Sequence, residues 1–352
     1  MANYNNMSNH ESISKFLFFI IPLSFLVVVL GFFFNLIPSN AVLLINSNNY
    51  LDTSNFAYGQ QQEEEKENQI NSNITTNSLN VQNIPPKKVH VGDIDIAYKT
   101  FGKGDPILLI NGFSFAMDSW APTLLEKLAS NHTVIVFDNR GIGNTTLGTK
   151  QVSIEQFAND TAGLLDALNI RKADVLAWSL GGVIAQELVL NHHDRVEKLI
   201  LYATTCGGEE SIPPSQEVQN ALANQTGTAE ERIAKLVPLF FPEEWRKENP
   251  NYLEYIPKTT ETIPNQTLNK QLEARGNWEG ACERLKNINQ PTLVIVGTED
   301  APTPAANSLI ITERIPGAWL IQIKGAGHAL MYEYPEQFSN IIETFLENTN
   351  TL

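Results

Sequence analysis

Basic residues are scarce in this chain of 352 residues, in which 24 lysines and arginines stand against 39 aspartates and glutamates, for a net charge of -15. The sequence has no basic stripe that could neutralise phosphates, so it argues against a nucleic-acid partner.

Cysteine is scarcer still. The two cysteines, Cys206 and Cys282, lack the CxxC spacing of a zinc or redox site. The six histidines are scattered, without metal-ligand spacing. We therefore expect no metal and no organic cofactor.

Charge is absent from one stretch near the start, the apolar run from Phe16 to Ile37. A bilayer core is crossed by about 20 apolar residues, and the apolar part of an export signal has roughly 7–15. We therefore interpret residues 1–45 as a membrane anchor, with a cleaved export signal as the main alternative and a buried helix as a third. Lys15 precedes the run, which favours a body outside the cytoplasm, either membrane-anchored or secreted.

Large apolar side chains are rare from residue 46 to 86, where Asn, Gln, Ser and Glu dominate. Such a segment cannot bury enough surface to offset the entropy of ordering it. We expect a disordered polar linker over these residues.

From Lys87 the pattern becomes that of a globular α/β domain, which we assign to residues 87–348. Apolar and polar residues alternate on both sides of Gly92-Asp93, as in a hairpin. Short continuous apolar runs, typical of strands covered on both faces, follow at 107–110, 134–137, 175–178, 198–202, 292–296 and 319–323. Helical patterns lie between them at 121–129, 154–168, 183–190 and 335–346. This alternation predicts a doubly wound, mostly parallel sheet.

One region interrupts the alternation, from about residue 207 to 286. It contains several amphipathic stretches and no strong strand, and predicts a helical cap at the carboxyl edge of the sheet, where such sheets bind ligands. Cys206 and Cys282 bracket it. Outside the cytoplasm they could form a disulfide that ties down the cap, but we favour the interpretation of two buried free thiols.

The most informative segment runs from Ala177 to Gly181, AWSLG, between an expected strand and an expected helix. A serine at such a junction with small neighbours is the pattern of a nucleophile elbow, G-x-S-x-G. The alternative is a plain strand–helix loop with a capping serine. Here Ala177 replaces the first glycine of the pattern.

Other segments, taken with this one, resemble the α/β-hydrolase family in chain order over about residues 88–348. NGFSFAMDSW (111–120) resembles the family's HGxxxxxxxW segment, and FDNRGIGNT (137–145) its D-x-R-G-x-G loop. LVIVGTEDAPTP (293–304) resembles the strand that delivers the catalytic acid, and GAGHALMYEYPEQF (325–338) the histidine loop and last helix. The resemblance implies an α/β-hydrolase fold with a helical cap.

The resemblance also implies roles for single residues. Ser179 is the expected nucleophile and His328 its base. Asp300 is the expected orienting acid, with Glu299 as its main competitor and Glu209 or Glu210 as more remote ones.

The oxyanion would be held by the backbone N–H groups of Phe113 and Leu180. Gly112, Ala177 and Gly181 would support the elbow and its neighbouring loop, and Asn111 stands where the family usually has histidine.

The expected activity is hydrolysis of a small carboxylic ester, lactone or thioester through an acyl-enzyme intermediate, since a serine hydroxyl needs a base to attack a carbonyl. The same triad serves C–C bond hydrolysis, perhydrolysis and aminopeptidase chemistry in the family. A non-catalytic ligand-binding protein is the alternative from a different class. The expected partners are a small acyl substrate and, through the N-terminal helix, a membrane.

Overall fold

The computed structural model describes residues 42–46, 81–224, 226, 229–257 and 263–348. The apolar run from Phe16 to Ile37 and most of the polar linker lie outside the described residues, so the anchor and linker stay predictions. Over the described ranges, no helix is both long enough and apolar enough to cross a membrane.

Nine strands form one sheet within the described part of the chain, in the order β1-β9-β8-β7-β6-β4-β5-β3-β2. They are β1 (Val42–Asn46), β2 (Lys87–Val91), β3 (Ile94–Gly102), β4 (Asp105–Ile110), β5 (His132–Phe137), β6 (Ala173–Trp178), β7 (Val196–Tyr202), β8 (Thr292–Gly297) and β9 (Trp319–Lys324). All neighbours are parallel except the β2–β3 and β3–β5 pairs. The predicted hairpin and the mostly parallel, doubly wound sheet are confirmed.

Two of the inner strands, β6 and β8, are buried along their whole length, which explains their continuous apolar sequences. All six residues of β6 and all six of β8 are buried. Helices cover both faces of the sheet, so neither face needs polar residues. β1 is an addition to the expected strands. It pairs with β9 at the sheet edge, and Val42 lies opposite Leu320.

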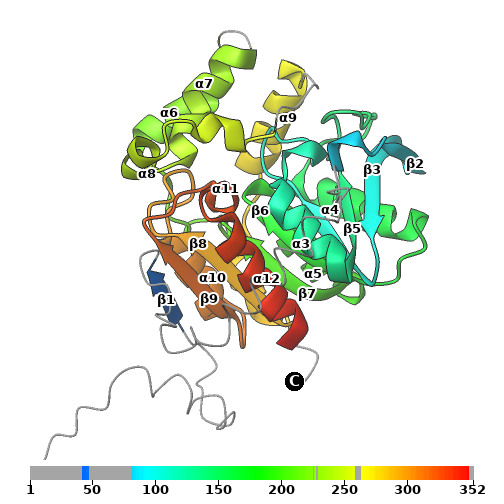
Figure 1. Ribbon diagram of the computed structural model, residues 1–352. Coiled ribbons are helices and arrows are strands. Elements are labelled where there is room, and N and C mark those ends of the chain that lie inside the picture. Colours follow the sequence, from blue (N-terminus) through cyan, green and yellow to red (C-terminus); the bar gives the residue numbers. More distant parts are fainter. Residues whose placement is uncertain (1–41, 47–80, 225, 227–228, 258–262, 349–352) are drawn as a thin grey trace, which may run out of the picture. The chain divides into compact units, whose positions relative to one another are not determined.

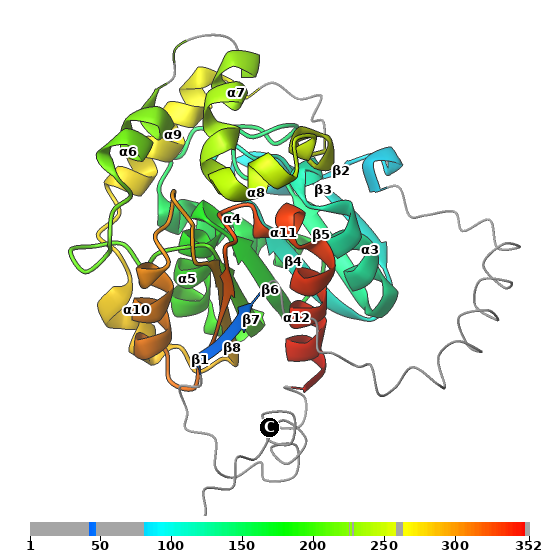
Figure 2. The same ribbon diagram turned by 60° about the vertical axis from the view of Figure 1, so that its left-hand side comes forward.

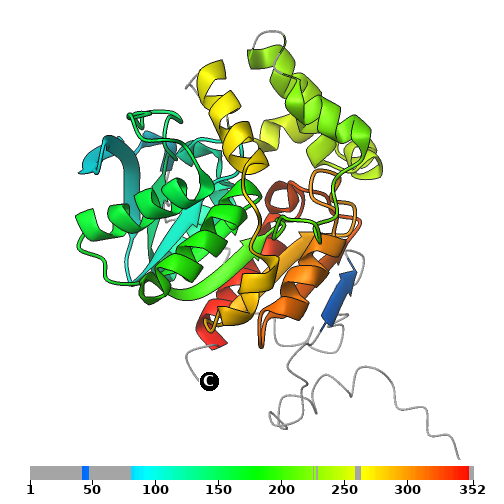
Figure 3. The same ribbon diagram turned by 180° about the vertical axis from the view of Figure 1, so that it is seen from behind.

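Two layers of helices enclose the sheet. In Figure 1, α3 (Pro122–Asn131), α11 (Leu330–Glu333) and α12 (Pro335–Asn348) lie on the near face. In Figure 3, seen from behind, α4 (Ile154–Ala167), α5 (Leu180–Asn191) and α10 (Ala306–Arg314) cover the other face. The buried apolar side chains form two clusters, one under each layer.

Short 3-10 segments are η1 (Val81–Asn83), η2 (Met117–Ser119), η3 (His193–Arg195), η4 (Tyr252–Tyr255) and η5 (Cys282–Asn287).

The start of α4 is capped by a serine side chain. The Ser153 hydroxyl accepts a hydrogen bond from the Gln156 N–H at 3.1 Å, as a capping residue does. The Gln156 side chain does not accept a hydrogen bond from the Ser153 N–H, as it would in a full capping box. It donates to Asp160 Oδ1 at 2.8 Å instead, because Asp160 lies one turn further along the same helix.

The described residues between β7 and β8 form four α-helices, which are α6 (Gln216–Ala223), α7 (Ala229–Phe240), α8 (Glu243–Glu248) and α9 (Asn265–Gly276). Figures 1 and 2 show them grouped at one end of the sheet. Two hydrogen bonds fix which end this is. The Ala329 N–H, beyond β9, donates to Phe240 O at 3.0 Å, and the Ser114 N–H, beyond β4, donates to Gln271 Oε1 at 3.1 Å. The cap helices therefore lie over loops that leave the carboxyl ends of the strands.

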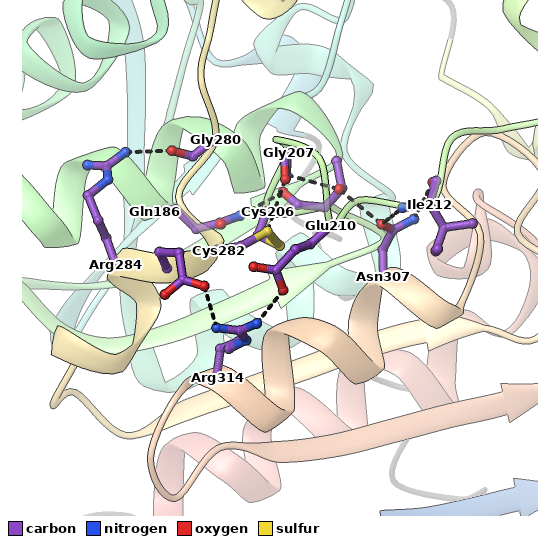
Figure 4. The surroundings of a disulfide bond; sticks show 12 residues. Gln186, Cys206, Gly207, Glu210, Ile212, Gly280, Cys282, Arg284, Asn307 and Arg314 are labelled. Atoms are coloured by element: carbon purple, nitrogen blue, oxygen red, sulfur yellow. Dashed lines mark hydrogen bonds and ion pairs between the residues drawn. A yellow bond between two sulfur atoms is a disulfide. The ribbon is translucent and has the colours of Figure 1, made fainter.

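Cys206 and Cys282 form a disulfide with their Cα atoms 4.9 Å apart (Figure 4). The favoured interpretation of two free thiols is therefore wrong. Spacing in the sequence did not reveal the pairing, because 76 residues separate the two. The backbone brings them together: the Ala281 N–H donates to Cys206 O at 2.7 Å. The disulfide thus joins the segments by which the chain enters and leaves the cap.

Candidate active site

Ser179 occupies a strained turn between β6 and α5. Its φ of 54° and ψ of -117° lie in a region that non-glycine residues rarely adopt. The turn is held by two backbone hydrogen bonds, from the Ser179 N–H to Tyr202 O at 2.9 Å and from the Gly182 N–H to Ser179 O at 2.9 Å. This strained turn, held in place at the end of a central strand, presents the short polar side chain of Ser179 at the edge of the sheet.

The glycines around Ser179 are required by close contacts with neighbouring segments. A Cβ at Gly181 would lie 2.1 Å from the Ile110 carbonyl oxygen, and a Cβ at Gly182 would lie 2.6 Å from the Thr204 side chain. A Cβ at Gly112 would lie 3.1 Å from Ser179 Cβ. Ala177 is fully buried. The elbow therefore packs directly against the loop that follows β4.

Asp300 and His328 form a buried pair, although 28 residues separate them in the chain. His328 Nδ1 lies 2.9 Å from each carboxylate oxygen of Asp300. The Thr303 N–H also donates to Asp300 Oδ1, at 2.7 Å. A carboxylate only accepts hydrogen bonds, so Nδ1 must carry the proton. The neutral imidazole then keeps a lone pair on Nε2, as a general base requires.

The histidine loop is tied to the residues that flank the elbow. The carbonyl oxygen of His328 accepts from Trp178 Nε1 at 3.2 Å and from Tyr202 Oη at 2.6 Å. The rings of Trp178 and His328 lie 5.6 Å apart between centroids. Since Ser179 follows Trp178 and donates its N–H to Tyr202 O, the serine and the histidine are held by the same two aromatic residues.

The competing acids are placed elsewhere. Glu299 is exposed, and its backbone N–H donates to Ala326 O at 2.9 Å. Glu210 forms an ion pair with Arg314 (Figure 4). Of the candidate acids, the structure brings Asp300 to the imidazole.

Two backbone N–H groups near Ser179 were expected to hold an oxyanion. Leu180 is the first residue of α5, so its N–H has no acceptor within the helix. Phe113 lies in the loop after β4, next to Gly112. Asn111 holds this loop together: its Nδ2 donates to Ala116 O at 2.7 Å, and its backbone carbonyl oxygen accepts from Asn139 Nδ2 at 3.2 Å.

A second buried carboxyl group lies beside the pair. Both oxygens of Glu333 lie 3.0 Å from the Gly327 nitrogen, one residue before His328. The pKa of Glu333 is raised to about 8, mainly by burial and to a smaller extent by the negative charges of Asp300 and Glu299, against the opposing effect of the Gly327 hydrogen bond. At neutral pH Glu333 is therefore mostly protonated, and Asp300 is the carboxylate that faces the imidazole.

The loop after β5 has a structural role. Asp138 accepts hydrogen bonds from the N–H groups of Met117 at 2.7 Å and Asn144 at 2.9 Å. Arg140 forms ion pairs with Asp93 and Asp160, at 2.8 and 2.7 Å, and the guanidinium lowers the pKa of Asp93. These groups hold loops together.

Sequence reasoning missed Tyr202, Glu333 and Gln271. Tyr202 ends the buried run of β7, which was the one available signal that its side chain reaches the same sheet edge. Burial raises the pKa of the Tyr202 hydroxyl well above its ordinary value, so it stays a hydrogen-bond donor. No cluster of potential metal ligands occurs among the residues that the structure describes.

Comparison with known proteins identifies the fold family. The model of a protein family described as having the alpha/beta hydrolase fold matches residues 105–335. The chain is similar to RutD of Azorhizobium caulinodans, whose name describes a carbamate hydrolase, with 31% identity over 265 residues that cover 73% of this chain and 96% of that protein.

The chain is also similar to solved structures of enzymes. A thermophilic esterase from Thermogutta terrifontis is 26% identical, with a TM-score of 0.66 over 76% of this chain and 100% of the esterase. Est816, described as an N-acyl homoserine lactone degrading enzyme, is 26% identical, with a TM-score of 0.60 over 74% of this chain and 100% of its own.

Proposed function

Because this chain belongs to the α/β-hydrolase family, we propose that it is a serine hydrolase that cleaves a small carboxylic ester, lactone or thioester through an acyl-enzyme intermediate. The observation that carries the proposal is the Asp300–His328 hydrogen bond at 2.9 Å, in a loop tied to the flanks of the strained Ser179 turn. A protein that only binds its ligand would not need an imidazole whose tautomer is fixed in this way.

The proposed reaction follows from these positions. Ser179 Oγ attacks the substrate carbonyl while its proton passes to His328 Nε2. The carbonyl oxygen becomes an oxyanion, which accepts hydrogen bonds from the N–H groups of Phe113 and Leu180. The intermediate collapses, and the leaving group departs with the proton from Nε2. Water then gives a proton to His328 Nε2 and attacks the acyl carbon, the bond from that carbon to Ser179 Oγ breaks to release the acid, and Nε2 returns the proton to Oγ.

Asp300 has an electrostatic role in this scheme. Its carboxylate holds Nδ1–H in place and stabilises the imidazolium that forms when Nε2 takes up the serine proton. Its side chain is fully buried, so little water screens this interaction. The histidine thus needs no reorientation between attack and proton return.

The names of related proteins support acyl transfer as the reaction class. The Thermogutta protein is described as an esterase and Est816 as a lactone-degrading enzyme. Carbamate hydrolysis is a second candidate, because RutD of Azorhizobium shares 31% identity and its name describes a carbamate hydrolase. All three substrates present a carbonyl carbon to the nucleophile.

We also propose that the domain works outside the cytoplasm. The Cys206–Cys282 disulfide supports this, because disulfides persist in oxidising compartments. The apolar run from Phe16 to Ile37 supports attachment to a membrane or export.

The test is a substrate panel. Wild type and Ser179→Ala are assayed against p-nitrophenyl esters of rising acyl length, a thioester, a lactone and a carbamate. The proposal expects wild type to hydrolyse at least one ester, lactone or thioester and Ser179→Ala to lose that turnover. Turnover of the carbamate alone would favour the second candidate. Equal turnover by both proteins would overturn the assignment of the nucleophile.

A further inference from the structure

One cap residue reaches the proposed oxyanion loop. Gln271 lies on α9, and its side chain is fully buried. Its Oε1 accepts a hydrogen bond from the Ser114 N–H at 3.1 Å. Ser114 follows Phe113, and its φ of 63° makes it a second strained non-glycine residue at this edge of the sheet. Gln271 therefore connects the cap to the loop that would hold the oxyanion.

The helix that carries Gln271 is fixed at a second point. Thr267, one turn earlier on α9, is buried, and its side chain approaches to 3.0 Å the point where a Cβ of Gly141 would lie. Gly141 belongs to the loop after β5 and has a positive φ of 74°, where a side chain would be strained. Two contacts with two different loops make this part of the cap a precise support for a polar side chain.

The hydrogen bond to Ser114 fixes the direction of the Gln271 amide. An N–H faces Oε1, and the opposite orientation would place two donors against each other. Nε2 therefore points away from the Ser114 N–H. It is buried, and no residue of the described part of the chain accepts from it. A buried donor without an acceptor is unfavourable and rare in native proteins, so this one is best explained by an acceptor that arrives with a ligand.

Resting on the proposed hydrolase function, we propose that Gln271 Nε2 donates a hydrogen bond to a second oxygen of the substrate, close to the carbonyl that Ser179 attacks. The substrate class is then narrower than small esters in general. It consists of acyl compounds whose acyl group carries an oxygen acceptor beside the reacting carbonyl. A plain alkyl chain in that place would leave Nε2 unpaired, which a hydrogen-bonding site disfavours.

The test compares two esters that differ by one atom. In p-nitrophenyl methoxyacetate an ether oxygen replaces a methylene group of p-nitrophenyl butyrate. The ratio of their kcat/KM values, divided by the ratio of their uncatalysed rates, measures the preference for oxygen. Wild type, Gln271→Met and Gln266→Met are assayed, since Gln266 is an exposed residue of the same helix and serves as the matched control.

We expect wild type and Gln266→Met to prefer methoxyacetate, and Gln271→Met to lose about fivefold to tenfold of that preference. Loss of the Ser114 contact lowers turnover of both esters alike and cancels in the ratio. An unchanged ratio in Gln271→Met overturns the inference. So does a wild-type enzyme without the preference, which decides the question even where Gln271→Met does not fold. If wild type turns over neither ester, the inference fails, whereas the hydrolase proposal fails only if wild type hydrolyses no ester, lactone or thioester of the panel.

Discussion

His328 Nδ1 lies 2.9 Å from both carboxylate oxygens of Asp300, and both side chains are almost completely buried. The carboxylate is satisfied by the imidazole and by the Thr303 N–H. It can therefore stay charged in the interior and keep the proton of the imidazole on Nδ1, away from Ser179.

Replacing Asp300 with asparagine should remove this control. An asparagine can present an N–H to Nδ1 and favour the wrong tautomer, so we expect kcat to fall by about 10³- to 10⁴-fold. Glu299→Gln is the matched control, because Glu299 is the neighbouring carboxylate and is exposed. It should retain activity close to that of wild type. Steady-state kinetics with an ester that wild type hydrolyses gives the kcat of both variants. An equal loss of kcat in Glu299→Gln would contradict the assignment of Asp300.

The elbow should not tolerate a methyl group at Gly181. The Cβ of Gly181→Ala would lie 2.1 Å from the Ile110 carbonyl oxygen, so the strand and helix must separate. We expect a loss of about 1–3 kcal/mol in the free energy of unfolding. Gly276→Ala is the control, since nothing lies within 4 Å of its Cβ position. Urea unfolding measures both, and similar stabilities of the two variants would contradict the packing argument.

Removing the disulfide should destabilise the domain without touching the triad. The Cys206–Cys282 bond closes a loop with a sequence separation of 76, for which loop-closure entropy predicts a loss of about 4 kcal/mol. The double variant Cys206→Ala/Cys282→Ala should show this loss in denaturant unfolding and should be insensitive to reductant. Wild type should lose a similar amount when reduced. A reductant effect of equal size in the double variant would show that another process is responsible.

Stability should depend on pH through Glu333. Burial holds its pKa at about 8 in the folded protein, against an ordinary 4.5. The folded state binds this proton more tightly than the unfolded state, so the contribution is full below about pH 4.5 and is lost as pH rises to about 8. The loss is on the order of a few kcal/mol.

Glu333→Gln cannot titrate, so its stability relative to wild type should rise steadily from about pH 5 to pH 8. Urea unfolding at several pH values measures the difference between the two proteins. The buried carboxyl of Asp174, whose pKa burial raises to about 6, is present in both and cancels. A constant difference over this range would mean that Glu333 is not the titrating group.

Most of the fold could be predicted from the sequence, because its central strands are buried on both faces. Continuous apolar runs identified β4 to β9 within a few residues, and Gly92-Asp93 identified the hairpin. β1 could not be found in this way, since its position depends on pairing with β9 at the far end of the chain.

The site was harder to predict wherever a contact depends on tertiary structure. Ser179, Asp300 and His328 could be placed through local motifs at the ends of buried strands. The Cys206–Cys282 pairing and the Gln271–Ser114 bond could not, because they join segments 76 and 157 residues apart. Glu333 was missed for a similar reason: its protonation depends on burial beside Asp300, which no sequence pattern reports.

The most direct test of the account is labelling with a fluorophosphonate, which reacts with an activated serine, followed by peptide mass spectrometry. Wild type, Ser179→Ala and His328→Ala are compared at one probe concentration. We expect wild type to carry the label on the peptide that contains Ser179, Ser179→Ala to carry none, and His328→Ala to be labelled far more slowly. Label on a different residue, or equal labelling of wild type and Ser179→Ala, would contradict this expectation.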